Sequence, residues 1–180
     1  MKKSLKVILC ATVYIAAIAG LSVVFTVVGE PGNAPGTISS GEVPAYQAPA
    51  GQNTNASLTG WTAEPSQGEE HWISPGGSAR FIVKRAAAYQ EDLEAYAKAN
   101  VSSIEMERVE ELSALACGEI GGRQTYVYAY ADFGQKPVQY RKIYIFNTNN
   151  RTYGAMGVTE NREALEEIGF DSIVAGYQFE

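Results

Sequence analysis

The hydrophobic positions at the start of the chain form one unbroken run. Residues 7–28 are apolar or small and carry no charge, and Lys2, Lys3 and Lys6 stand just before them. At about 1.5 Å per residue, a helix of this length reaches about 33 Å, enough to cross a hydrocarbon core of about 30 Å. We therefore expect one transmembrane helix over 7–28. Residues 1–6 would be a cytoplasmic stub, because lysines hold their end of a span on that side.

A signal peptide is the alternative interpretation of the same segment. Ala17-Ile18-Ala19 fits the small-x-small pattern of a cleavage site. Cleavage there would leave the apolar residues 21–28 on the mature terminus, where they would reduce solubility. We therefore favour an anchor that is retained, or a signal that is not cleaved.

Residues 29–57 have no hydrophobic periodicity. They contain Pro31, Pro35, Pro44 and Pro49 among glycine, serine, asparagine and threonine. Such a segment buries too little apolar surface to offset the entropy of ordering it. We expect a plain linker with an average span of roughly 30 Å. Tyr46, its only large aromatic residue, gives weak support for a docking motif.

From residue 58 onward, short alternating runs and a helical period predict one α+β domain over 58–180. A Pro-Gly turn at 75–76 indicates a hairpin, and residues spaced as Tyr89, Leu93, Tyr96 and Val101 indicate an amphipathic helix. We expect strands at 60–62, 71–73, 79–84, 112–117, 125–131, 138–146, 152–159 and 177–179, and helices at 89–101, 160–168 and 170–174.

The most regular alternation lies in the run from Thr125 to Ala131, which places three tyrosines on one face of a strand. With the two strands that follow, it predicts an antiparallel meander. Tyrosine offers a large contact area and a polar tip, which suits a binding surface. Our candidate binding surface consists of Tyr126, Tyr128, Tyr130, Tyr140 and Tyr144. The alternative is that this face lies beneath a helix.

The order of elements resembles the Mog1/PsbP-like α/β/α sandwich, in which helices cover both sides of a central antiparallel sheet. The segments that carry the resemblance are Gly60-Trp61, 120–124, 153–159, 172–173 and 177–179. The resemblance covers about residues 58–180. It implies a binding or assembly factor and carries no catalytic residues over to this chain.

The charge of the domain and its few reactive side chains argue against nucleic-acid binding and against catalysis. From residue 29 onward, 11 basic residues stand against 20 acidic ones, and such a domain repels nucleic acid. His71 is the only histidine, which removes most hydrolytic and zinc constellations. Cys117 lies in a small apolar run, and we expect it to be a buried strand residue. We expect no catalytic residues, no metal and no cofactor.

The sequence therefore predicts a non-enzymatic binding or assembly domain of a bacterial envelope protein. It would be a single-pass protein of the cell membrane, with its C-terminal domain outside the cytoplasm and a protein partner in the envelope. The alternative function is an envelope enzyme, hydrolase-like, that uses Cys117 and His71 or carboxylates.

Overall fold

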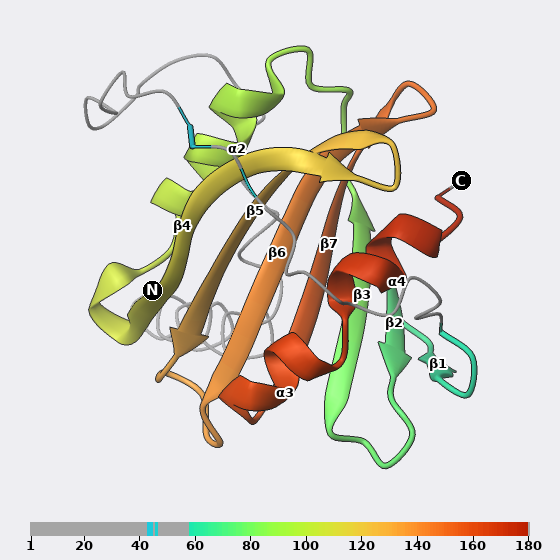
Figure 1. The fold of residues 1–180 in the computed structure, drawn as a ribbon, viewed down its shortest axis with the longest axis vertical. Coiled ribbons are helices and arrows are strands. Elements are labelled where there is room, and N and C mark those ends of the chain that lie inside the picture. The colour runs from blue at the N-terminus through green and yellow to red at the C-terminus, as the bar shows by residue number, and fades with distance from the viewer. Residues whose placement is uncertain (1–42, 45, 47–57, 180) are drawn as a thin grey trace, which may run out of the picture.

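A seven-stranded antiparallel sheet forms the centre of the molecule (Figure 1). The computed structural model describes residues 43–44, 46 and 58–179. The strand order across the sheet is β1-β2-β3-β7-β6-β5-β4, so that β1 and β4 form its two edges. The strands are β1 (Thr62–Glu64), β2 (Glu69–Ile73), β3 (Ala79–Arg85), β4 (Val109–Ile120), β5 (Arg123–Asp132), β6 (Gln139–Thr148) and β7 (Arg151–Thr159).

The predicted hairpin and the predicted meander are both confirmed. Strand β2 pairs with β3, and β5, β6 and β7 follow one another as antiparallel neighbours. Tight turns make these connections possible, and Asn149 and Asn150 both adopt positive φ between β6 and β7. The α+β class with an antiparallel sheet is therefore the observed architecture.

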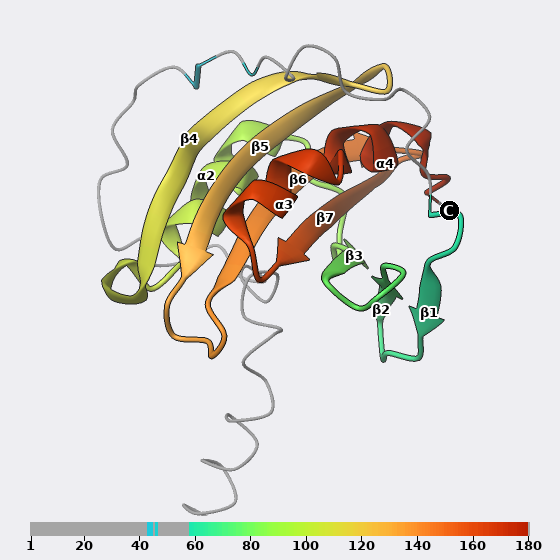
Figure 2. The same cartoon turned by 60° about the horizontal axis from the view of Figure 1, so that its bottom comes forward.

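Helices lie on both sides of the sheet (Figure 2). Helix α2 (Leu93–Ser102) packs on one face, and its first turn is capped by Asp92, which accepts a hydrogen bond from the Ala95 amide at 2.9 Å. Helices α3 (Arg162–Glu167) and α4 (Phe170–Gly176) pack on the other face. The sheet thus separates two hydrophobic cores, one under α2 and one under α3 and α4.

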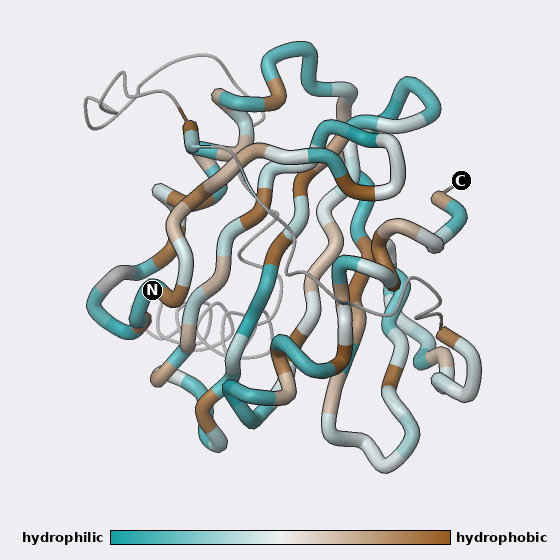
Figure 3. The backbone as a smooth tube through the Cα atoms, in the orientation of Figure 1, coloured by the Kyte–Doolittle hydropathy of each residue, from teal (hydrophilic) through white to brown (hydrophobic). Residues whose placement is uncertain are grey.

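Polar residues sit in the middle of one strand between these cores. Figure 3 shows the turns as mostly hydrophilic and the central strands as a mixture of hydrophobic and intermediate positions, with a hydrophilic stretch within β6. This stretch is Arg141 and Lys142, whose exposed fractions are only 3% and 4%. Neighbours in a strand point to opposite faces, so each core receives one of these two cations.

Strand β4 differs from the prediction. We expected a short strand at 112–117, but β4 runs from Val109 to Ile120 and contains Glu110 and Glu111. Both glutamates are exposed, and charged residues are common on edge strands. Two register shifts, between Glu111 and Ser113 and between Ser113 and Ala116, accompany the curvature of this strand.

The last predicted strand is absent, since residues 177–179 belong to no strand of the described chain. The aromatic pattern there serves packing instead. The Phe179 ring lies 4.7 Å from that of Phe146 and 4.8 Å from that of Tyr177, measured between centroids. Asn149 donates a hydrogen bond to the Phe179 carbonyl. The sheet is already complete when the chain leaves α4, so these rings cover its face.

The predicted anchor over 7–28 and most of the predicted linker lie outside the described residues. Within the part of the chain that the structure describes, no helix has the length and hydropathy needed to span a bilayer.

Candidate functional site

The five tyrosines of the predicted binding surface do not form one surface. Tyr126, Tyr128 and Tyr130 share the face of β5 that α2 covers, and each is at most 5% exposed. Tyr144 lies opposite Val127 and packs in the other core with no exposed surface, and the half-buried Tyr140 packs there too. The prediction of a single tyrosine face was therefore wrong, because Tyr140 and Tyr144 pair with the intervening residues of β5.

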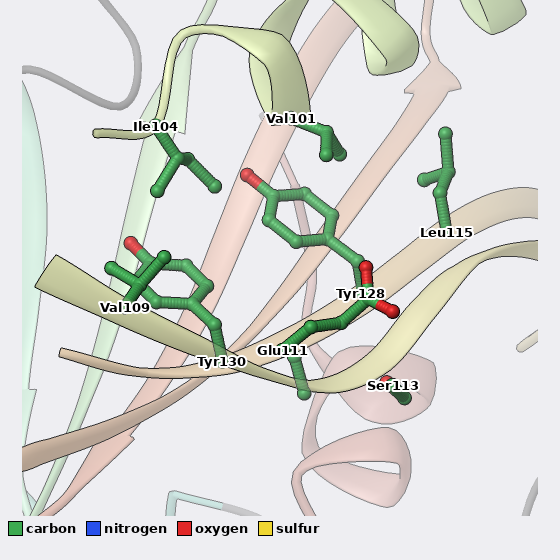
Figure 4. Close-up of a pocket in the computed structure, with 9 residues that line it drawn as sticks. Val101, Ile104, Val109, Glu111, Ser113, Leu115, Tyr128 and Tyr130 are labelled. Atoms are coloured by element: carbon green, nitrogen blue, oxygen red, sulfur yellow. The ribbon is translucent and has the colours of Figure 1, made fainter. Parts of the chain in front are cut away.

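Two of the tyrosines under α2, Tyr128 and Tyr130, line a small cavity (Figure 4). The rings of Tyr128 and Tyr130 point from β5 toward Val101 and Ile104, and the free space is about 20 Å³, room for about one water molecule. The Tyr128 hydroxyl is buried and has no hydrogen-bond partner among the described residues. Burial, followed by its neighbour Cys117, raises the pKa of Tyr126 to about 12. This cavity is too small for a ligand larger than water.

A buried polar cluster lies in the opposite core, between β6 and α4. Lys142 Nζ is 2.9 Å from Asp171 Oδ1, and the Tyr144 hydroxyl donates a hydrogen bond to the same carboxylate at 2.6 Å. Lys142 and Asp171 are 4% and 5% exposed. The hydroxyl of Tyr46 donates to the second carboxylate oxygen, also at 2.6 Å. We call Lys142, Tyr144 and Asp171, with Tyr46 bound to them, the Asp171 cluster.

Strand β6 and helix α4 position the side chains of the Asp171 cluster. Lys142 and Tyr144 are two residues apart in β6 and therefore point to the same face. Asp171 follows Phe170 in the first turn of α4, and Phe170 holds this turn against the sheet. Close contact is possible because β7 has Gly157 at this point, where a Cβ atom would lie 2.5 Å from the Phe170 ring.

Tyr46 reaches the cluster because Pro44 and Tyr46 lie along the outer edge of β4. The Cys117 amide donates to the Pro44 carbonyl, and the Tyr46 amide donates to the Cys117 carbonyl. Cys117 thus bonds through its amide to Pro44 and through its carbonyl to Tyr46. Two such bonds from one residue to positions two apart are the pattern of parallel strands. Figure 2 shows these short coloured pieces of the N-terminal trace beside β4.

Side chains of this segment contact both hydrophobic cores. The Val43 side chain packs against the core under α2, while Tyr46 packs against the core under α4. Gly118 permits this approach, since a Cβ atom there would lie 2.6 Å from the Tyr46 carbonyl oxygen and 3.0 Å from its Cβ. Val43, Pro44 and Tyr46 therefore combine backbone pairing with side chains that pack on opposite faces of the sheet, as an added strand does.

Electrostatics hold both phenols of the cluster in their neutral form. Burial, and then the hydrogen bond to Asp171, raises the pKa of Tyr46 above its ordinary value of 10.0. Burial, and then the negative charge of Asp171, raises the pKa of Tyr144 well above that value. Two neutral phenol donors and one ammonium group thus surround a single carboxylate. Lys142 also lies 5.4 Å from the centroid of the Tyr46 ring, within range of a cation–π contact.

The residues of the alternative enzyme are far apart. His71 is in β2 and interacts with Glu69 at 2.8 Å, whereas Cys117 is in β4 at the opposite edge of the sheet. Four strands separate them, which corresponds to a distance on the order of 20 Å. Cys117 is a strand residue as predicted, but at the sheet edge it is only half-buried. Among the described residues, no three His, Cys, Asp or Glu side chains gather closely enough to hold a metal ion.

Sequence reasoning missed Lys142 and Asp171 and gave Tyr46 little weight. Lys142 could have been noticed, because it stands in an otherwise apolar strand next to Tyr144. Asp171 gave no signal, since an acidic residue in the first turn of a helix is ordinary. The pairing of Tyr46 with this carboxylate joins residues 125 positions apart in the chain, which no local pattern reveals.

Comparisons with known proteins identify no family for this chain. No family model matches it, and no curated protein matches it. Among solved structures it is similar to a crystal structure from Pseudomonas aeruginosa of a protein of unknown function. The identity is 11%, the match covers 67% of this chain and 97% of that chain, and the TM-score is 0.47.

Proposed function

We propose that this protein is a membrane-anchored binding or assembly module whose folded domain lies outside the cytoplasm. The apolar run over 7–28, the preceding lysines and the linker over 29–57 support the anchor and its orientation. Helices on both sides of an antiparallel sheet are compatible with the Mog1/PsbP-like α/β/α sandwich, which we propose as the fold of residues 58–180.

One observation carries the binding role: a piece of chain from the linker is seated on an open sheet edge. Cys117 of β4 forms backbone hydrogen bonds with Pro44 and Tyr46, and Asp171 accepts a hydrogen bond from the Tyr46 hydroxyl. Strand addition to an exposed edge is a common way for a domain to recognise an extended peptide. The acidic balance of the domain makes a protein a better partner than a nucleic acid or an anionic lipid.

The enzyme alternative has less support. The separation of Cys117 from His71 leaves neither of them the partner that a nucleophile and base pair requires. The Asp171 cluster does hold reactive groups, but Tyr46 and Tyr144 already occupy both oxygens of its carboxylate. We therefore assign the cluster to binding.

Membrane orientation tests the localisation part of the proposal. A reporter fused after Glu180 should be digested by protease added to intact, wall-stripped cells, because the lysines precede the span. Changing Lys2, Lys3 and Lys6 to glutamate is the matched control and should reduce the exposed fraction. Full protection of the reporter fused to the unchanged chain would contradict an extracytoplasmic domain.

A further inference from the structure

The edge of β4 and the Asp171 cluster together hold Pro44 and Tyr46, which belong to this same chain. This segment uses little of the strand edge. Among the described residues of the twelve-residue strand β4, only Cys117 forms backbone hydrogen bonds with Pro44 and Tyr46. A longer extended peptide could pair with more of the same edge. Residues 43–46 would then be a tethered occupant that a partner displaces.

The charged groups around the Tyr46 side chain favour an unphosphorylated tyrosine in the ligand. The carboxylate of Asp171 lies at the end of the Tyr46 side chain and accepts a hydrogen bond from its hydroxyl, while Lys142 lies beside the ring. Phenylalanine would fill the same space but leave one carboxylate oxygen without this donor. A phosphorylated tyrosine would bring negative charge against Asp171 and Glu166, which lies 4.0 Å from Lys142.

Two further features restrict the rest of the ligand. The place of Val43 against the core under α2 favours an apolar residue three positions before the tyrosine. The missing side chain at Gly118 leaves room for the backbone of the added strand, because the three atoms nearest to a Cβ there all belong to Tyr46.

From these contacts we infer that the β4 edge is a binding site for an extended segment of a partner protein in which an apolar residue stands three positions before an unphosphorylated tyrosine. Residues 43–46 are its ligand within the chain and compete with the partner. The inference rests on the proposed binding function and adds the chemistry of the ligand. A tether of a few to a few tens of residues gives a local concentration on the order of millimolar, so the intramolecular ligand is a strong competitor.

The test uses the full chain in detergent micelles and a fluorescent synthetic peptide with the sequence of residues 41–49. The receptor is a Val43→Gly/Tyr46→Gly variant, in which the competing segment is weakened. We expect this variant to bind the peptide about tenfold or more tightly than the unchanged chain does, measured by fluorescence anisotropy. Replacing the peptide tyrosine with phenylalanine should weaken binding about tenfold, since a hydrogen bond to a charged group is lost. The phosphotyrosine peptide should not bind.

Gly118→Ala, added to the receptor variant, is the matched control. The new methyl group should abolish peptide binding while tryptophan fluorescence and circular dichroism stay unchanged, because it meets the ligand first. A folded receptor variant that does not bind the peptide at millimolar concentration would overturn the inference. Equal binding with and without Gly118→Ala would also overturn it. Neither result bears on the membrane orientation, which the reporter measures separately.

Discussion

Replacing Asp171 with alanine is expected to lower the free energy of unfolding by about 3–5 kcal/mol. Asp171 balances Lys142, which is 4% exposed, and accepts hydrogen bonds from Tyr46 and Tyr144. Its removal leaves a buried ammonium group without its main counter-charge and two phenols without their acceptor. Urea unfolding of the full chain in detergent micelles, followed by tryptophan fluorescence, measures this loss.

A double substitution separates the charge from the packing. Asp171→Leu combined with Lys142→Met removes both charges and keeps apolar volume in the core. Replacing a whole buried ion pair in this way is often close to neutral. We therefore expect the double variant to recover the part of the lost stability that comes from the unpaired ammonium group, while Tyr46 and Tyr144 still lack their acceptor. A double variant as unstable as Asp171→Ala would show that Lys142 does not depend on this carboxylate.

Replacing Phe170 with alanine is expected to cost about 3–5 kcal/mol of unfolding free energy, the usual range for a buried phenylalanine. Its ring is 1% exposed, is stacked on Phe81 and meets Trp61 edge-on, with centroids 6.4 Å away in both cases. Because this ring fixes the first turn of α4, its loss should also loosen the position of Asp171. Urea unfolding measures the free energy.

Gly157 provides a second test of the same contact. Gly157→Ala alone would place a methyl group within 2.5 Å of the Phe170 ring and should cost about 1–3 kcal/mol through overpacking. In the Phe170→Ala background the same methyl group enters the space that the ring has left. The double variant should therefore be more stable than the sum of the two single effects predicts. Strict additivity would contradict the close packing of α4 on β7.

Local signals were enough to predict the hairpin from its Pro-Gly turn, the meander from the alternation of side chains, and the helix near Leu93 from its helical spacing. These elements are local, and the faces that they bury are visible in the order of residues. The length of β4 was underestimated because Glu110 and Glu111 do not fit a buried strand. At a sheet edge one side of the strand is open, and only the topology reveals that β4 is an edge.

The candidate site could not be predicted in the same way, because it combines three distant parts of the chain. Tyr46 belongs to a segment that looks like a spacer, Lys142 to a sheet strand and Asp171 to a short helix. Each residue is ordinary in its own context. The antiparallel order of the sheet, the packing of α4 against Gly157 and the backbone pairing of Pro44 and Tyr46 with Cys117 bring the three together.

Hydrogen exchange at the Cys117 amide tests most directly whether residues 43–46 occupy the β4 edge. In the full chain this amide donates to the Pro44 carbonyl, so it should exchange slowly although it belongs to an edge strand. A Tyr46→Ala variant loses the side chain that holds the segment. Its Cys117 amide should exchange about tenfold faster or more, while the amide of Tyr144 in the middle of the sheet stays unchanged. Equal exchange at Cys117 in both proteins would contradict the proposed occupancy of this edge.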